Sequence, residues 1–315
     1  MSTTLIHPAA KFCDPDVTAK GEARAKVSYT GTKTLWLNTG TLCNIQCANC
    51  YIESSPKNNR LVYLTLADVL PYLDELEAAG ETEIEIGITG GEPFMVPDII
   101  AIMTAALERG HRLMVLTNAM QPMMRPRVRE GLLELKARFG TALTLRVSLD
   151  HYSAKLHDEE RGAGAFNITL RGLAWLAENR FRVDLAGRTV WGEDESDARQ
   201  GYGRLIYDLG LDTRADDPGS LVLFPEMEDG EEPPEITTAC WGILGKSPDS
   251  LMCASQRMVV KRKGATAPSV LACTLIPYDE RFELGDTLAE ARGDVALNHP
   301  FCASFCVLGG GSCSA

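Results

Sequence analysis

Short apolar runs rich in β-branched residues alternate along this chain with longer segments of helical periodicity. The strand-like runs cover residues 33–40, 83–91, 112–119, 141–150, 182–190 and 220–227. Helical patterns cover residues 65–80, 98–110, 128–140 and 168–179. Strands that alternate with helices in this way predict an α/β fold, in which right-handed crossovers connect the strands of a parallel sheet.

The pattern contains six βα units, which are too few to close a barrel of eight strands. It fits either an open partial barrel or a doubly wound sheet, and periodicity does not separate the two. In both folds the chemistry lies at the carboxyl ends of the strands, where Gly90, Asn118, Asp150 and Arg188 occur. The segment 226–235 is rich in acidic residues and contains two prolines, which predicts a linker. We expect the domain boundary to lie there.

Length and charge narrow the class of protein. A chain of 315 residues with 45% hydrophobic content can form one large α/β core and a smaller second unit. Its net charge of -12 argues against nucleic acid or an anionic membrane as a partner. The first fifteen residues do not form a signal peptide, and no apolar run approaches the roughly eighteen residues of a membrane span. We therefore expect a cytoplasmic protein.

Nine of the ten cysteines fall into two groups, and Cys13 stands alone. Cys43, Cys47 and Cys50 lie together, no cysteine occurs in residues 51–239, and six more occur in residues 240–313. In a reducing compartment, cysteines are more often metal ligands or catalytic groups than disulfide partners. Cysteines that merely fill a core would be scattered, so the grouping predicts two metal-binding regions.

The first group has C-x3-C-x2-C spacing and directly follows the first predicted strand. A structural zinc site needs four closed ligands, which are commonly arranged in C-x2-C pairs. Three cysteines on one loop can instead hold three irons of a [4Fe-4S] cluster and leave the fourth iron open to an outside ligand.

This cysteine loop, with Tyr51 directly after its third cysteine, resembles the signature of the radical S-adenosylmethionine (SAM) superfamily. The resemblance implies that Cys43, Cys47 and Cys50 bind the cluster, and that the amino and carboxylate groups of SAM chelate the open iron. An electron from the cluster then breaks the sulfonium bond of SAM. The resulting 5'-deoxyadenosyl radical abstracts a hydrogen atom from the substrate.

A second motif, Gly90-Gly91-Glu92-Pro93, ends the second predicted strand and resembles the GGEP motif of the same superfamily. The resemblance implies contact with the methionine amino group of SAM. Paired glycines allow a ligand to approach the backbone closely, and Glu92 offers negative charge to an ammonium group. The alternative is an ordinary turn between a strand and a helix.

Further matches follow at the ends of later strands. Residues 148–150 and 157–162 resemble the SxD and HDxxRG segments of radical SAM proteins that carry SPASM or twitch extensions. The resemblance implies that Ser148 and Arg161 hold the SAM carboxylate or ribose, and that Asn118 lines the adenosyl pocket. Loop caps and surface ion pairs are the alternatives for these residues. Candidates for a direct catalytic role are Asp150, Arg188 and Cys240.

The second group comprises Cys240, Cys253, Cys273, Cys302, Cys306 and Cys313. Cys253 and Cys273 bracket a hairpin-like segment whose closure would bring them together. The order resembles a twitch or SPASM extension, with zinc as the competing metal. Six thiolates cannot ligate two clusters at four apiece, so we expect one auxiliary [4Fe-4S] cluster. Its expected ligands are Cys253, Cys273 and two of the last three cysteines, with Cys240 the expected non-ligand.

Together these features predict an N-terminal extension at residues 1–32, a partial (βα)6 TIM-like barrel at 33–228 and an auxiliary iron-sulfur domain at 229–315. The predicted function is a radical SAM oxidoreductase or maturase acting on a small molecule or a peptide, with a flavodoxin or ferredoxin as electron donor. About thirty residues precede the first strand, too few for a leader-binding domain, so we expect a small substrate or a peptide delivered otherwise. The alternative is a non-enzymatic iron-sulfur or zinc scaffold, such as an electron carrier.

Overall fold

The computed structural model describes residues 10–224 and 233–311, and its centre is a sheet with the strand order β10-β9-β8-β2-β3-β4-β5-β6-β7. From β2 to β7, each strand lies parallel to the next strand in the sequence. These strands are Thr34–Asn38, Glu85–Thr89, Arg112–Thr117, Leu143–Ser148, Arg182–Arg188 and Leu221–Phe224. The predicted parallel sheet of α/β type is confirmed.

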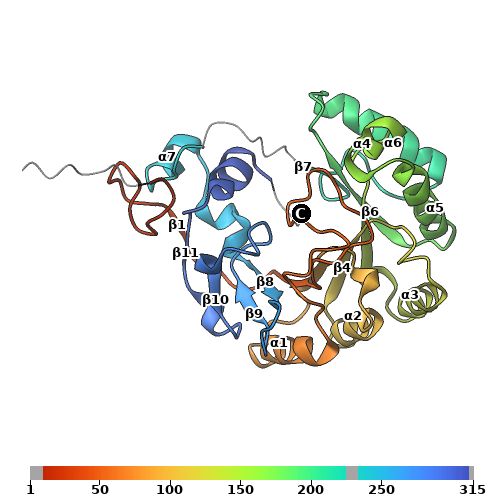
Figure 1. Ribbon diagram of the computed structural model, residues 1–315, viewed down its shortest axis with the longest axis horizontal. Coiled ribbons are helices and arrows are strands. Elements are labelled where there is room, and N and C mark those ends of the chain that lie inside the picture. Colours follow the sequence, from red (N-terminus) through yellow and green to blue (C-terminus); the bar gives the residue numbers. More distant parts are fainter. Residues whose placement is uncertain (1–9, 225–232, 312–315) are drawn as a thin grey trace, which may run out of the picture.

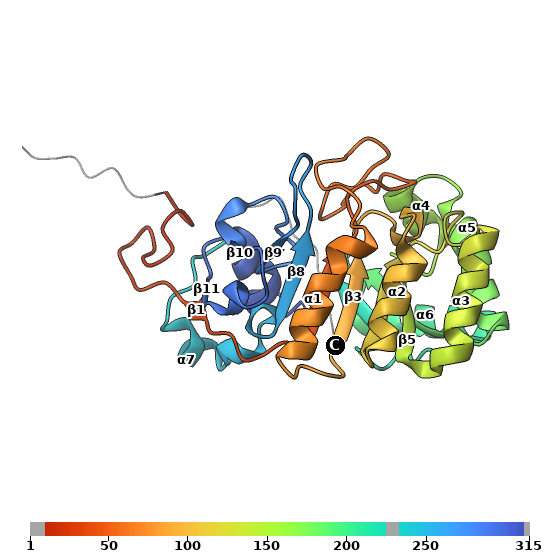
Figure 2. The same cartoon turned by 90° about the horizontal axis from the view of Figure 1, so that it is seen from below.

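The major helices cover one face of the sheet. They are α1 (Leu66–Ala78), α2 (Ile99–Glu108), α3 (Pro126–Phe139), α4 (Ala154–Arg161), α5 (Ala165–Glu178) and α6 (Glu195–Leu209). Figure 1 shows them on the outside of an arc whose inner side is formed by the strands, and Figure 2 shows α1, α2 and α3 side by side along the sheet. Helices on a single face distinguish an open partial barrel from a doubly wound sheet.

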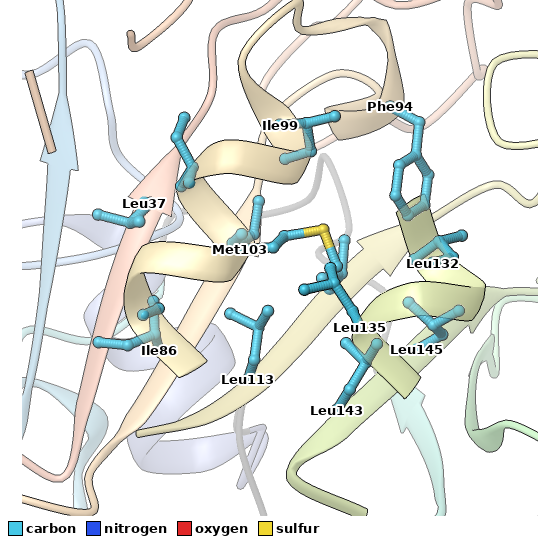
Figure 3. Close-up of a cluster of buried hydrophobic side chains, with 14 of the residues drawn as sticks. Leu37, Ile86, Phe94, Ile99, Met103, Leu113, Leu132, Leu135, Leu143 and Leu145 are labelled. Atoms are coloured by element: carbon cyan, nitrogen blue, oxygen red, sulfur yellow. The ribbon is translucent and has the colours of Figure 1, made fainter. Parts of the chain in front are cut away.

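A hydrophobic core joins these helices to the sheet (Figure 3). Leu37 and Ile86 point outward from β2 and β3, Met103 comes from α2, and Leu132 and Leu135 come from α3. All five are nearly or fully buried. Truncation of such a side chain to alanine typically lowers the free energy of unfolding by about 2–5 kcal/mol. This layer therefore holds the helices firmly against the strands whose carboxyl ends form the site.

Two helices, α4 and α6, were not predicted as separate elements. The α6 helix contains Gly201 and Gly203, which weaken a helical pattern in the sequence. Its buried face compensates, because Tyr202 is fully buried and its hydroxyl donates to the carbonyl of Leu149 over 2.7 Å. A Cβ on Gly201 would lie 2.4 Å from the ring of Tyr152, so packing requires the glycine there.

The second unit extends the same sheet on the other side of β2. Strand β8 (Gln256–Val260) lies parallel to β2, and β9 (Ser269–Leu271) pairs antiparallel with β8. Strand β10 (Glu283–Gly285) follows at the edge. The hairpin predicted between Cys253 and Cys273 is therefore confirmed.

The remaining elements are short. Strands β1 (Lys26–Val27) and β11 (Val295–Ala296) form a two-stranded sheet, α7 spans Cys240–Leu244, and a π-helical segment spans Cys302–Leu308. Single 3-10 turns occupy Pro93–Met95, Gly140–Ala142, Pro248–Ser250, Met252–Ala254, Glu280–Phe282 and Glu290–Arg292. The predicted linker at residues 226–235 falls mainly outside the described residues. Within the described part of the chain, no helix combines the length and apolar character that a bilayer span requires.

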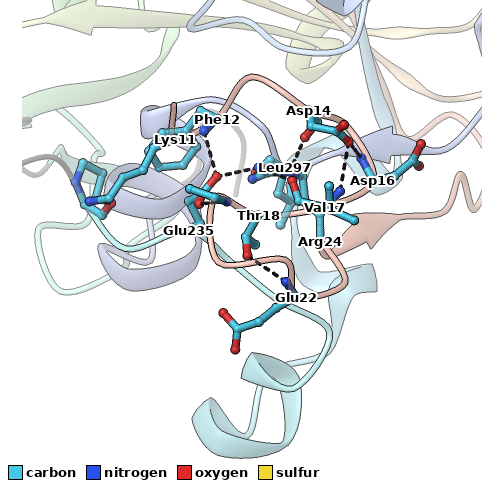
Figure 4. Close-up of polar contacts among 12 residues, drawn as sticks. Lys11, Phe12, Asp14, Asp16, Val17, Thr18, Glu22, Arg24, Glu235 and Leu297 are labelled. Atoms are coloured by element: carbon cyan, nitrogen blue, oxygen red, sulfur yellow. Dashed lines mark hydrogen bonds and ion pairs between the residues drawn. The ribbon is translucent and has the colours of Figure 1, made fainter. Parts of the chain in front are cut away.

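A buried ion pair ties the N-terminal segment to the second unit (Figure 4). The guanidinium of Arg24 donates to Glu235 Oε1 over 2.5 Å and to the carbonyl of Leu297 over 3.2 Å. The same carboxylate accepts from the backbone N–H groups of Phe12 and Ala19, each over 2.7 Å. Residues far apart in the sequence thus share one hydrogen-bonded junction next to β1 and β11.

Candidate functional site

An open cavity of about 1120 Å³, here called the first cavity, lies at the carboxyl ends of the parallel strands. Cys43, Cys47 and Cys50 line it together. Its wall also contains most of the other predicted site residues, namely Tyr51, Gly90, Gly91, Asn118, Ser148, Asp150, Arg161 and Arg188. The structure thus brings to one place residues that come from the cysteine loop, from β3, β4, β5 and β6, and from α4.

The cysteine loop is fixed by its own backbone. The N–H of Cys43 donates to the carbonyl of Ser55 over 3.1 Å, and Cys50 Sγ accepts from the N–H of Ser54 over 3.3 Å. Cys43 is 5% exposed, and burial raises the pKa of its thiol to about 12. Burial also raises the pKa of Cys47, although Arg161 opposes the shift. Buried thiols with raised pKa values lose their protons when a metal supplies the positive charge, so the residues present fit an iron-sulfur cluster.

Gly90 and Gly91 pack directly against the cysteine loop. Gly90 has a φ of +134°, and a Cβ there would lie 2.6 Å from the carbonyl oxygen of Gly40. A Cβ on Gly91 would lie 2.2 Å from the carbonyl oxygen of Leu42. Close approach is the reason for the glycine pair, as the sequence indicated, but the group that approaches Gly91 is the backbone just before Cys43.

Glu92 and Pro93 are not part of the cavity lining. The Glu92 carboxylate is 1% exposed and accepts from Thr117 Oγ1 over 2.9 Å, from the N–H of Asn118 over 2.9 Å and from the N–H of Phe94 over 3.1 Å. Burial raises its pKa to about 7, although these hydrogen bonds favour the charged form. Glu92 therefore joins the ends of β3 and β4, and Pro93 begins the 3-10 turn beside it.

Asn118 connects this framework to the cysteine loop. Its side-chain amide donates to Asn44 Oδ1 over 2.9 Å and lies 3.9 Å from Cys43 Sγ. Because its own N–H is bound by Glu92, the position of the Asn118 side chain depends on that carboxylate. Asn118 consequently links the carboxylate of Glu92 to the cysteine loop, and it also lines the first cavity.

Asp150, Arg161 and Arg188 form a charged group on the cavity wall. Arg161 Nε and Nη2 donate to the two oxygens of Asp150 over 2.5 and 3.1 Å, and Arg188 Nε lies 3.6 Å from Asp150 Oδ1. Burial alone would raise the pKa of Asp150, but the two guanidinium groups outweigh it and lower the pKa. Two cations against one anion leave a positive field that suits a ligand carboxylate. They also make Asp150 a weak proton acceptor.

Trp36 is a site residue that the sequence motifs did not identify. Its indole N–H donates to Gln256 Oε1 over 2.9 Å, and its ring occupies the space that a Cβ on Gly87 would need. Trp36, Thr274 and Leu275 line the first cavity and also a second one. The alternation in β2, where Leu35 and Leu37 face the helices, is the signal that places Trp36 on the inner face.

The second cavity, of about 550 Å³, is lined by Cys253, Cys273, Cys302 and Cys306. The first two flank the β8–β9 hairpin, and the other two lie within the π-helical segment. Burial raises the pKa of Cys253 to about 11 and that of Cys302 to about 12. Four thiols around one small and mainly apolar cavity fit a fully ligated [4Fe-4S] cluster.

The other two cysteines of the second group do not join this lining. Cys240 lies in α7, where its Sγ accepts from the N–H of Thr237 over 3.4 Å, and neither cavity includes it. Cys313 lies outside the described residues. Across residues 10–224 and 233–311, no three histidine, cysteine or acidic side chains are already drawn together as a metal-ligand group, so the thiols share cavity walls rather than a closed coordination shell.

Comparison with known proteins identifies the family. The sequence model of the radical SAM superfamily matches residues 37–200, more than half of the chain, and the chain belongs to that superfamily. The superfamily predicted from the cysteine loop is thereby confirmed, and with it the [4Fe-4S] cluster and SAM that give this superfamily its name and chemistry.

Two curated relatives match a similar share of the chain. AlbA, the antilisterial bacteriocin subtilosin biosynthesis protein of Bacillus subtilis, is 30% identical over 145 residues, which are 46% of this chain and 30% of AlbA. The AdoMet-dependent heme synthase of Methanosarcina barkeri is 30% identical over 140 residues, which are 44% of this chain and 37% of the synthase. The chain thus matches less than two fifths of the length of either relative.

Solved structures agree in fold. SuiB from Streptococcus suis, bound to S-adenosylmethionine, has a TM-score of 0.58 at 13% identity, covering 81% of this chain and 63% of SuiB. The structure of anSMEcpe with bound AdoMet and Cp18Cys peptide has a TM-score of 0.57 at 13% identity, covering 82% of this chain and 79% of that protein. These similarities support a common fold over about four fifths of this chain.

Proposed function

We propose that this chain is a radical SAM oxidoreductase or maturase that abstracts hydrogen from a peptide or small-molecule substrate. One observation carries the proposal: three thiols, a glycine pair and two guanidinium groups surround the same cavity at the carboxyl ends of the strands. An electron carrier would need the thiols but neither the charged wall nor a cavity of this size.

Within the first cavity, Cys43, Cys47 and Cys50 hold the cluster. Arg161 would bind the SAM carboxylate, and Asn118, Ser148 and Tyr51, which line the same cavity, would contact the rest of SAM. When bound, the cluster and SAM together supply a 5'-deoxyadenosyl radical. Because Glu92 is held by β4, its contribution is to position Asn118 and the glycine pair.

The second cavity is proposed to hold one auxiliary [4Fe-4S] cluster on Cys253, Cys273, Cys302 and Cys306. Cys240 is proposed as a non-ligand that has no part in the first cavity either. Residues 33–228 would then form the SAM-binding unit and residues 229–315 the auxiliary unit. The pairing of β1 with β11 attaches the N-terminal extension to the auxiliary unit.

The remaining lining of the first cavity indicates the chemical character of the substrate group that would enter it. Trp36, Leu116, Ala186, Phe224 and Leu275 form an apolar wall. We therefore propose that an apolar or aromatic group of the substrate enters this cavity and undergoes dehydrogenation, epimerisation or cross-linking. A peptide is consistent with the names of relatives, since SuiB has been crystallised with the precursor peptide SuiA. A cytoplasmic flavodoxin or ferredoxin is the proposed electron donor.

The test is anaerobic reconstitution with iron and sulfide, followed by incubation with SAM and dithionite. We expect 5'-deoxyadenosine, measured by liquid chromatography and mass spectrometry, in excess of a control without protein. A scaffold or electron carrier would load iron and form none. Iron-loaded protein that leaves SAM intact would therefore overturn the proposal.

A further inference from the structure

The segment between the second and third cysteines of the loop is held by a carboxylate from α4. Asn49 directly precedes Cys50, and its side-chain amide donates to Glu160 Oε1 over 2.7 Å. The backbone N–H of Asn49 donates to Glu160 Oε2 over 3.3 Å. The backbone carbonyl of Glu160 also accepts from the N–H of Ala48 over 2.8 Å. One residue of α4 therefore binds three donors from two adjacent residues of the loop.

This contact is half-buried and supported from a second direction. Glu160 is 6% exposed whereas Asn49 is exposed, so the carboxylate is shielded from water on the side of α4 and water reaches the contact only from the side of the loop. The carbonyl of Asn49 accepts from the guanidinium of Arg188, which lies over the ring of Tyr51 at 4.8 Å. The loop is thus fixed between α4 and β6 at the position where its third cysteine faces the first cavity.

We propose that Glu160 is a positioning residue for the SAM-binding cluster, and that it acts through Asn49 on Cys47 and Cys50. This rests on the proposed cluster of the first cavity. A carboxylate accepts hydrogen bonds at both oxygens, and Asn49 presents two donors, so the pair is complementary. Arg161 follows Glu160 directly and binds Asp150, so the last turn of α4 fixes the cysteine loop and the charged wall together.

The carboxylate of Glu160 and the amide of Asn49 can be exchanged between the two positions, which tests the contact more sharply than removing either group. Glu160→Gln keeps an oxygen for the backbone N–H of Asn49 and presents an amide nitrogen to the Asn49 side chain, which can accept through its own oxygen once its amide turns over. This variant therefore removes the negative charge of residue 160 and keeps the number of hydrogen bonds. Asn49→Asp sets two carboxylates against each other. The double variant Asn49→Asp/Glu160→Gln restores both contacts. In it, the amide nitrogen introduced at position 160 donates to the new carboxylate, while the amide oxygen accepts from the backbone N–H of position 49.

The matched control is Glu159→Gln. Glu159 is the exposed neighbour of Glu160 and accepts from the indole of Trp191 over 3.3 Å, which a glutamine oxygen can replace. The measurements are the SAM dissociation constant, the yield of 5'-deoxyadenosine, and the SAM-dependent change in the electron paramagnetic resonance spectrum of the reduced protein. That spectral change reports the geometry of the first cluster, which a general loss of stability would not alter.

We expect Glu160→Gln to weaken SAM binding by about threefold, since charge-assisted hydrogen bonds are replaced by neutral ones. Asn49→Asp should weaken it further and reduce the SAM-dependent spectral change. The double variant should return to within about twofold of the wild type, as coupled partners do. Glu160→Gln that behaves like Glu159→Gln, or a double variant no better than the worse single variant, would overturn the inference. Failure of the wild-type protein to cleave SAM would instead contradict the proposed function. The spectra would still compare SAM binding among the variants in that case, so the two failures can be told apart.

Discussion

The two cysteine-lined cavities share a wall but differ in size and polarity. The first is about 1120 Å³ and carries Asp150, Arg161 and Arg188 beside three thiols. The second is about 550 Å³ and surrounds four thiols with mainly apolar side chains. Arg257 also lines the second cavity, but its guanidinium donates hydrogen bonds to backbone carbonyls, including those of Ala291 and Cys253 over 2.7 and 2.6 Å.

This difference separates a site that exchanges its ligands from one that keeps a permanent group. Exchange requires an opening, charges that recognise SAM, and one iron without a protein ligand. A permanent cluster requires a full set of thiolates and exclusion of water. Trp36 and Leu275 lie in both walls, so a change on either side of them reaches the other cavity.

The largest expected effect comes from removing a thiol of the first cavity. Cys47→Ala should lower 5'-deoxyadenosine formation to the level of the protein-free control, because the cluster that binds SAM loses a ligand. Cys302→Ala should leave SAM cleavage in the absence of substrate largely intact. Cys13→Ala, at an exposed cysteine that belongs to neither lining, is the control. Equal loss in the Cys47 and Cys302 variants would show that the cavities do not act separately.

The next effect concerns iron. A triple variant with alanine at positions 43, 47 and 50 should retain about four irons per chain, the content of one [4Fe-4S] cluster. Mössbauer spectroscopy and iron analysis measure this. Adding Cys240→Ala should change nothing, whereas adding Cys253→Ala should remove most of the remaining iron. Near eight irons per chain would mean two auxiliary clusters. Bound zinc without iron would contradict the proposal of an auxiliary iron-sulfur cluster.

A smaller effect is expected at the glycine pair. Gly91→Ala should lower both iron retention in the first cavity and SAM affinity, because its Cβ would lie 2.2 Å from the carbonyl oxygen of Leu42 and displace the cysteine loop. Overpacking of this kind typically costs about 1–3 kcal/mol. Gly242→Ala is the control, since no atom lies within 4 Å of its Cβ. Weaker SAM binding with full iron content would mean that Gly91 serves only ligand approach.

The smallest effect on SAM cleavage is expected at the junction that supports the second unit. Glu235→Gln should lower the stability of the protein by about 1.5–3 kcal/mol, the range for hydrogen bonds to charged groups. Differential scanning fluorimetry measures the change in melting temperature, and SAM cleavage should persist. Lys26→Gln, which loses an exposed ion pair with Asp16, should have little effect.

The junction also predicts an acid dependence. Burial alone would raise the pKa of Glu235, but hydrogen bonds from Phe12, Arg24 and Ala19 lower it below the ordinary value of 4.5. A lowered pKa gives stability that is complete above the unfolded value and is lost as the pH falls through the folded one. The wild type should therefore lose its advantage over Glu235→Gln below about pH 4.5. A constant difference in melting temperature down to about pH 3 would contradict this linkage.

Sequence patterns were sufficient for features that depend on local order. The helix at Leu66–Ala78 begins with a capping box between Thr65 and Asp68, and its buried positions follow the helical period. The strands of the parallel sheet were predicted as apolar runs, and the hairpin was predicted from the segment between Cys253 and Cys273. The cysteine loop was recognisable because its ligands are close together in sequence.

Features that depend on partners distant in sequence were not predicted. Glu92 looks like a cavity residue beside two glycines, yet Thr117 and Asn118 bind its carboxylate beneath the lining. In the sequence, Glu160 is one of several neighbouring acidic residues. Its hydrogen bond with Asn49 becomes visible only in the folded structure. The attachment of the N-terminal segment to the second unit likewise depends on Arg24 meeting Glu235.

The position of β2 in the middle of the sheet has a consequence during synthesis of the chain. One edge of β2 pairs with β3, but the other must wait for β8, and 220 residues separate Trp36 from Gln256. At the usual pace of translation this edge stays unpaired for roughly 10–40 s. An unpaired hydrophobic strand edge invites pairing with other chains. Nascent chains are therefore most vulnerable to aggregation before the hairpin emerges, and slower expression at low temperature or more chaperone should raise the soluble yield.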